Sequence, residues 1–105
     1  MHSVLAGRPA LYILLALLGQ DRHGYEIMKK VEKDSGGEIR LGPATLYTTI
    51  RRLVDEGYIR HVSEEGEAED ARRRYYSLTN LGRETVAKEL SRMDYLVQTF
   101  KRKAI

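Results

Sequence analysis

The stretch GPATLYTTIRRLVDEGYIRHVS, residues 42–63, changes its periodicity at Gly57. Before Gly57, apolar residues recur every three or four positions, as on the buried face of a helix, and Pro43 stands where a first helical turn tolerates a missing N–H. After Gly57, the residues are rich in Tyr, Ile and Val and alternate as in a strand. The pattern predicts a helix over 44–56 followed by a strand over 58–63. The buried stripe of this helix is expected to consist of Leu46, Ile50, Leu53 and Val54.

Five segments around this stretch complete the predicted secondary structure. They are a fully buried helix over 10–18, a second helix from near His23 to Ser35, a short strand over 38–41, a strand over 73–78 and a long helix from an N-cap at Thr79 to about Lys103. The apolar run ALYILLALL (10–18) is too short for a membrane span, which needs roughly 20 residues. It also lacks a following small-x-small cleavage site, so it does not read as a signal peptide.

The predicted order of elements is three helices, a β-hairpin and a long final helix. In a mainly α (α+β) chain of 105 residues, this order is typical of a winged helix-turn-helix domain. We expect residues 1–79 to form the winged helix-turn-helix DNA-binding domain and residues 80–105 to form a C-terminal dimerisation helix.

The net charge of the chain hides an uneven distribution. Eighteen Lys and Arg against fifteen Asp and Glu leave only +3. The stretch SEEGEAEDA (63–71), expected to be the loop of the hairpin, contributes −5 to that total and leaves +8 on the remaining residues. The net positive charge of the residues outside this stretch favours a polyanionic partner such as double-stranded DNA.

The sequence contains no recognisable catalytic or metal-binding arrangement. Cysteine is absent, which excludes disulfides, iron–sulfur clusters and cysteine nucleophiles and fits a cytoplasmic location. His2, His23 and His61 have no spacing suited to metal ligation, and no phosphate-binding glycine loop is present. We therefore expect a protein that is not an enzyme and that needs no metal or cofactor.

The exposed face of the predicted 44–56 helix has the residue types that an inserted recognition helix needs. At about 100° per residue, this face collects Ala44, Thr45, Thr48, Arg51, Arg52 and Asp55, with Tyr47 at its edge. Small residues permit close approach, hydroxyls bond phosphates or base edges, and arginine binds phosphate or guanine in bidentate fashion. The alternative is an ordinary solvated face.

Three consecutive arginines, Arg72, Arg73 and Arg74, stand at the base of the second hairpin strand. Side chains alternate between the two faces of a strand, and guanidinium groups are costly to bury, so we expect at least two of them to reach outward toward DNA. The alternative is a charge cluster that protects an edge strand from pairing.

Four stretches of the sequence resemble the PadR family of bacterial transcription regulators. They are ALYILLALL (10–18), HGYEIMKKVEKDSGG (23–37), GPATLYTTIRRLVDEGYI (42–59) and RRRYYSLTNLGRE (72–84). The resemblance implies a winged-helix repressor that acts as a homodimer on DNA. It places Thr45 and Tyr47 in the recognition-helix signature and Arg73-Arg74 in the wing. Ala71 stands where the family often has proline, and the wing loop is unusually acidic.

With the resemblance included, the candidate DNA-binding residues are Tyr25, Ala44, Thr45, Tyr47, Thr48, Arg51, Arg52, Arg72, Arg73 and Arg74. The two-fold symmetry of a dimer predicts a pseudo-palindromic, inverted-repeat operator whose half-sites lie about one or two DNA turns apart. The alternative function is a winged-helix protein–protein interaction module that binds no DNA.

The last helix carries an apolar stripe with the spacing of a coiled-coil seam. Val86, Leu90, Met93, Val97, Phe100 and Ala104 follow one another at intervals of four and three residues. The first turns, around Leu81 and Val86, are expected to pack on the domain itself, and the later ones on a second chain. The expected dimer interface comprises Val86, Leu90, Met93, Leu96, Val97 and Phe100.

The resemblance also implies a small effector, often aromatic or drug-like, bound near the dimer interface. Candidate lining residues are Tyr12, Met93, Tyr95 and Phe100, because a first helix packed near the last would bring them together. Ordinary core and interface packing is the alternative for each of them.

Overall fold

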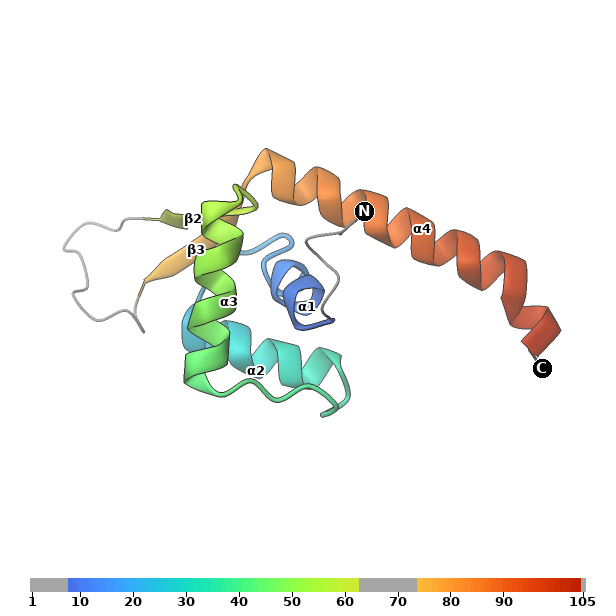
Figure 1. The fold of residues 1–105 in the computed structure, drawn as a ribbon, viewed down its shortest axis with the longest axis horizontal. Helices are drawn as coiled ribbons and strands as arrows, with labels where there is room; N and C mark the ends of the chain where they lie inside the picture. The colour runs from blue at the N-terminus through green and yellow to red at the C-terminus, as the bar shows by residue number, and fades with distance from the viewer. Residues whose placement is uncertain (1–7, 63–73, 105) are drawn as a thin grey trace.

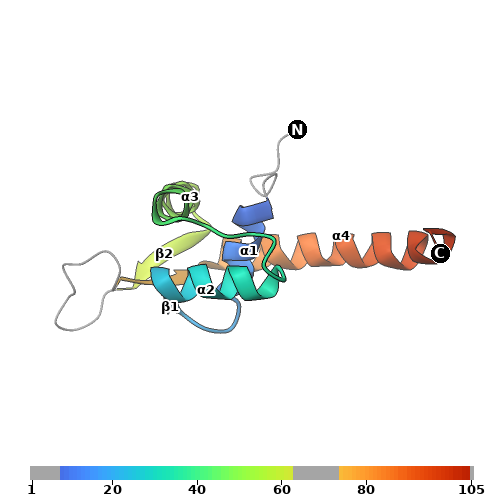
Figure 2. The same cartoon turned by 90° about the horizontal axis from the view of Figure 1, so that it is seen from below.

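The apolar faces of three helices meet a small sheet and form the core (Figures 1 and 2). The computed structural model describes residues 8–62 and 74–104. In chain order the elements are α1 (Arg8–Ala16), β1 (Arg22–His23), α2 (Gly24–Asp34), α3 (Pro43–Asp55), β2 (Ile59–Val62), β3 (Tyr75–Leu78) and α4 (Asn80–Ala104). The sheet is antiparallel with the strand order β1-β3-β2. Helix α1 lies between the other helices, and α4 projects away from the body.

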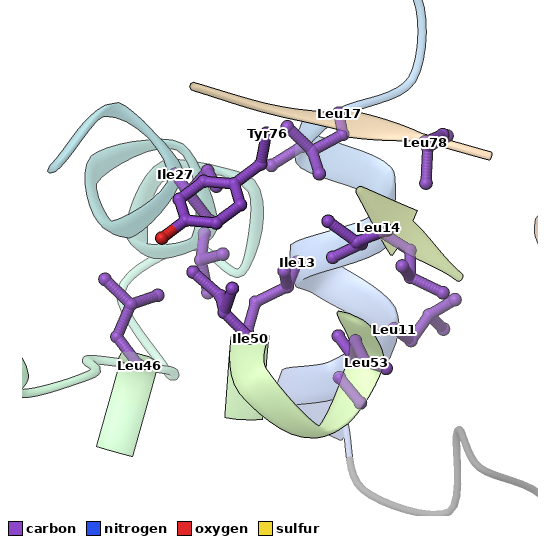
Figure 3. Close-up of a cluster of buried hydrophobic side chains, with 14 of the residues drawn as sticks. Leu11, Ile13, Leu14, Leu17, Ile27, Leu46, Ile50, Leu53, Tyr76 and Leu78 are labelled. Carbon is purple, nitrogen blue, oxygen red and sulfur yellow. The ribbon is translucent and has the colours of Figure 1, made fainter. Parts of the chain in front are cut away.

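The core is filled by branched aliphatic side chains from every helix and by one tyrosine from the sheet (Figure 3). Ile13 and Leu14 of α1, Ile27 of α2 and Leu53 of α3 are each 0% exposed. Tyr76 of β3 lies against them and is 3% exposed. Full burial of one such aliphatic side chain contributes about 1.5–3 kcal/mol. The predicted stripe of α3 is confirmed at Leu46, Ile50 and Leu53, whereas Val54 is partly buried.

The first helix is shorter and less completely buried than expected. It ends at Ala16, because the next N–H groups, of Leu17 and Leu18, bond three residues back in a tight final turn. Leu17 remains in the core, but Leu18 is 46% exposed. Tyr12 and Leu15 are partly buried against the core.

The predicted strand over 38–41 is wrong, and a strand that was not predicted lies elsewhere. The N–H of Ile39 donates to Ser35 Oγ at 2.9 Å, so a side chain satisfies this backbone in place of a strand partner. The strand that covers the free edge of β3 is β1, where Arg22 pairs with Tyr76. Arg22 Nε donates to the carbonyl oxygen of Ala16 at 2.7 Å, which holds β1 beside the end of α1.

Helix α2 begins with a capping box built on a histidine. The N–H of Glu26 donates to His23 Nδ1 at 3.4 Å, and the N–H of His23 donates to Glu26 Oε1 at 3.1 Å. Two N–H groups that lack partners inside the helix are satisfied in this way. His23 is therefore the N-cap of α2.

The hairpin is confirmed over its described part. Ile59 pairs with Leu78, and His61 pairs with Tyr76. Both strands are shorter than predicted, because Tyr58 and Arg74 lie just outside them. Ser63, Arg72 and Arg73, with the acidic stretch 63–71, lie outside the described residues.

Thr79 joins the hairpin to the start of α4, and its predicted role as N-cap is confirmed. Its hydroxyl donates to the carbonyl oxygen of Gly57 at 2.6 Å and accepts from the N–H of Gly82 at 3.0 Å. Its own N–H donates to the carbonyl oxygen of Tyr58 at 3.1 Å. These bonds fix the direction in which α4 leaves the domain.

Helix α4 passes so close to the backbone at Tyr58 that there is no room for a side chain at Gly82. A Cβ atom at Gly82 would lie 3.2 Å from the carbonyl carbon of Tyr58 and closer still to its oxygen, which is rigid backbone. Alanine is otherwise the better helix former by about 0.8–1 kcal/mol. We expect the clash to outweigh this gain, so that Gly82→Ala lowers the free energy of unfolding by about 1–3 kcal/mol. The change is measured by urea unfolding. Gly42→Ala, where the space is open, is the control, and an unchanged stability of Gly82→Ala would contradict the packing.

Helix α4 has 25 residues, which corresponds to a length of about 37 Å. None of the described helices combines the length and the apolar character that a membrane crossing requires.

Candidate nucleic-acid interface

Helix α3 presents the predicted polar face to solvent, opposite its buried stripe. Figure 2 shows the helix almost end-on at one surface of the body. The side chains exposed on this face are those of Ala44, Thr45, Thr48, Arg51, Arg52 and Asp55. The division of α3 into two faces therefore agrees with the sequence analysis.

The two arginines on this face differ in their surroundings. Arg52 Nε lies 3.5 Å from Glu56 Oε1, so part of its charge is offset within the helix. Among the described residues, Arg51 takes part in no ion pair. Arg51 is therefore the guanidinium group that α3 offers most freely to an anion.

Tyr47 has a structural role besides its place at the edge of the exposed face. It is partly buried against the core, and its ring crosses the beginning of α2 at Gly24. A Cβ atom at Gly24 would lie 2.8 Å from Cε1 of this ring. The HGYE and TLY segments of the sequence are thus in direct contact.

Tyr25, a candidate DNA-binding residue, lies on the solvent side of α2. Its side chain is 52% exposed, while Ile27 and Val31 of the same helix are buried. At about 100° per residue, a position two before Ile27 points well away from the buried face. Lys29 Nζ lies 5.2 Å from the centre of the Tyr25 ring, so a cation accompanies it at the surface.

A groove of about 200 Å³ lies between α3 and the hairpin, and we call it the α3–hairpin groove. Its lining side chains come from Tyr47, Ile50, Arg51, Val54, Asp55, His61, Arg74 and Tyr76. Arg74 is exposed and is the member of the arginine triplet that the structure describes. Sequence reasoning missed His61 and Tyr76 as neighbours of the α3 face. The sequence does contain a signal for this placement. Side chains alternate between the two faces of a strand, so the paired residues His61 and Tyr76 lie on the same face of the hairpin.

Burial raises the pKa of the Tyr76 phenol above its ordinary value of 10.0, and nearby Tyr47 adds to the rise while Arg74 opposes it. Ionised tyrosine is therefore less favourable in the folded protein than in the unfolded chain. The stabilising effect is complete below pH 10.0 and is lost as the pH rises through the folded-state pKa.

We expect the free energy of unfolding of the wild type to fall more steeply above pH 10.0 than that of Tyr76→Phe. The difference between the two proteins is measured by urea unfolding over a pH series. A difference that stays constant across the series would contradict the burial of this phenol.

The outer part of α4 exposes most of the stripe that the sequence assigns to a dimer. The exposed fractions are 41% for Leu90, 38% for Met93, 48% for Leu96, 50% for Val97 and 52% for Phe100. Val86 differs, because it is 1% exposed and belongs to the core of its own domain. The assignment of Val86 to a dimer interface is therefore wrong. Leu81, expected to pack on the domain, is 48% exposed.

The candidate effector-lining residues differ in their exposure. Tyr12 is partly buried against the core, whereas Met93 and Phe100 are exposed on α4. Tyr95 is 63% exposed and, at about 100° per residue, projects from the side of α4 opposite the apolar stripe. An effector site at these residues stays a prediction.

Within residues 8–62 and 74–104, no three His, Asp or Glu side chains lie close enough together to hold a metal ion.

Comparison with known proteins identifies the family of the chain. Residues 13–88 match the sequence pattern described as the transcriptional regulator PadR-like family. The chain belongs to the PadR-like family. Members of this family are transcriptional regulators, which places the chain, at the level of the family, among regulators and not among enzymes.

Individual PadR-like and related proteins are similar along most of the chain. An uncharacterized protein X of Lysinibacillus sphaericus is 33% identical over 85 residues, which cover 77% of this chain and 73% of that protein. A transcriptional regulator from Clostridium thermocellum is 27% identical, with a TM-score of 0.71 over 94% of this chain and 95% of that one. Bacillus subtilis PadR in complex with operator DNA is 21% identical, with a TM-score of 0.67 over 81% of this chain and 47% of that one. The winged-helix architecture and the long last helix thus agree with solved PadR-like structures.

Proposed function

We propose that this PadR-like protein is a homodimeric transcriptional repressor that binds an inverted-repeat operator. The observation that carries the proposal is the exposed face of α3, where Arg51 stands free of ion pairs among the described residues beside small and hydroxyl side chains. A helix in the major groove needs this combination for close approach, for hydrogen bonds to base edges and for contacts to phosphate. The similarity in fold to Bacillus subtilis PadR, which was solved with operator DNA, supports the same mode of binding here.

The remaining candidate contacts extend this surface on both sides of α3. Tyr25 and Lys29 lie exposed on α2, and Arg74 lies at the base of the hairpin. Arg72 and Arg73 lie outside the described residues, and in our proposal their guanidinium groups also bind DNA phosphates.

In the proposed dimer, residues 1–79 bind DNA and residues 80–105 hold the two chains together. The support is the apolar stripe of α4, which leaves Leu96, Val97 and Phe100 about half exposed in the single chain. Apolar surface in a continuous stripe of this kind marks an interaction site. Two-fold symmetry would then set two α3 helices about one or two DNA turns apart.

We further propose that the dimer represses by occupying its operator, and that a small aromatic or drug-like effector bound near the α4 helices releases it. This regulatory step rests on the family resemblance alone.

Selection from a library of randomised DNA duplexes tests the proposed function. We expect the protein to enrich sequences that contain an inverted repeat, with half-site centres about one or two helical turns apart. The enriched sequence can then be searched for in the DNA beside the gene. A pool that remains random after repeated selection would overturn the proposal.

A further inference from the structure

We propose that the α3–hairpin groove seats one backbone phosphate of the bound DNA, held by Arg51, Arg74 and the protonated imidazole of His61. The inference rests on the proposed function and makes it specific: DNA binding takes up a proton at His61. It assigns a ligand contact to His61, which the candidate DNA-binding face does not include.

The groove lies beside the face of α3 that is proposed to enter the major groove. Tyr47, Arg51 and Asp55 are spaced four residues apart and form its α3 wall. Arg51 and Asp55 belong also to the exposed face of α3, so the groove opens directly onto that face. His61 and Arg74 form the opposite wall at the base of the hairpin.

The charges around the groove favour an anion. In the part of the chain that the structure describes, neither Arg51 nor Arg74 takes part in an ion pair. Asp55 is the acid among the lining residues, so one carboxylate faces two guanidinium groups and an imidazole. A phosphate accepts hydrogen bonds from all three of these groups, and charge-assisted bonds of this kind are the strong ones.

The ring of His61 is held in place by the strand opposite. Its centre lies 5.1 Å from the centre of the Tyr76 ring, at an interplanar angle of 45°, and the two residues are paired in the sheet. The imidazole therefore lies against a buried aromatic floor while its side chain remains exposed. Because the ring is already held in this position, binding a ligand costs His61 little further side-chain conformational entropy.

The titratable groups that face His61 determine the direction of the pH effect. From α3 these are Tyr47, Arg51 and Asp55, and from β3 they are Arg74 and Tyr76. A bound phosphate adds negative charge at the centre of the groove, so the complex favours protonated His61. DNA affinity should then rise as the pH falls through the range in which histidine gains charge, about pH 8 to 5.

The first test compares pH profiles of DNA affinity at fixed ionic strength. The wild type should bind the selected operator several-fold more tightly at about pH 6 than at about pH 8, whereas His61→Gln should lose this dependence. Asp55→Asn should tighten binding at both pH values, because it removes the opposing carboxylate. A pH dependence that survives unchanged in His61→Gln would overturn the inference.

The second test locates the phosphate itself. Single phosphates of the operator are replaced one at a time by neutral methylphosphonates. At one position per half-site, the replacement should weaken the wild type roughly 10-fold or more and should have little further effect on Arg74→Gln. Arg60→Gln is the matched control, because Arg60 is exposed on the same strand as His61 and points to the opposite face of the hairpin.

The outcomes separate the two proposals. If the protein binds DNA but no phosphate position is coupled to Arg74, the groove is not the phosphate seat and the proposed function stands. If inorganic phosphate alone shifts the His61 ring signals in NMR spectra and no operator position is coupled, the occupant is a free anion and the DNA assignment is wrong. If no duplex is bound at any salt concentration, both proposals fail.

Discussion

Replacing Val97 and Phe100 together with aspartate is expected to convert the protein to a monomer and to weaken its binding to an inverted-repeat duplex by at least about 100-fold. Both side chains are about half exposed in the single chain, at 50% and 52%, and in the proposed dimer a second chain buries them. Four apolar anchors are lost in each dimer. Each is already about half buried, so its burial in the dimer contributes about half of the 1.5–3 kcal/mol for full burial, and the four together contribute roughly 3–6 kcal/mol, before the repulsion between the new charges is counted.

The control for this double variant places the same charges elsewhere on α4. Ser91 and Gln98 are exposed and lie on α4 away from the apolar stripe. Ser91→Asp with Gln98→Asp should leave the protein dimeric. Sedimentation velocity distinguishes the species, and circular dichroism checks that the helices are retained. An unchanged sedimentation coefficient for the Val97 and Phe100 variant would contradict the assignment of the stripe to a dimer.

The second large effect is expected at the recognition face. Arg51→Ala should weaken operator binding by about 1–3 kcal/mol per contact, a factor of roughly 5 to 150. The side chain is exposed and takes part in no ion pair among the described residues, so its removal leaves no buried group without a partner. Stability should therefore change little, which separates a loss of binding from a loss of folding.

Arg83→Ala is the control for Arg51→Ala, because it removes another exposed guanidinium group, from α4 and not from α3. Its affinity for DNA should remain within about two-fold of the wild type. Arg52→Ala should fall between the two, since Glu56 already offsets part of its charge. Equal affinities for the wild type and Arg51→Ala would remove this residue from the interface.

The helices could be predicted from the sequence because their apolar periodicity is strong and local. The period of the 44–56 segment correctly separates the buried Leu46, Ile50 and Leu53 from the exposed arginines. The capping role of Thr79 also follows from residue type and position, and the hydrogen bond from the N–H of Gly82 agrees with it.

Features that depend on contacts far apart in the chain could not be predicted in the same way. Strand β1 has two residues and no periodicity of its own, and it exists because β3 offers a free edge about 50 residues later in the chain. The stripe of α4 runs without a break from Val86 to Phe100, so its spacing alone cannot tell which part the domain itself buries.

The α3–hairpin groove also required tertiary information. In the sequence, Tyr76 has the pattern of an ordinary strand residue. His61 and Tyr76 come to lie beside Arg51 because they pair in the sheet and because the hairpin packs against α3. Sequence reasoning identified the cations of this site but not the surface that unites them.

The affinity for DNA as a function of salt concentration tests the central claim most directly. Each neutralised phosphate contributes about 0.9 to the slope of log K against log salt. A dimer that binds at least two phosphates per chain, through residues such as Arg51 and Arg74, predicts a slope of about −3.6 or steeper. A slope near zero, or an absence of binding even at low salt, would contradict the account of α3 and the hairpin as a DNA-binding surface.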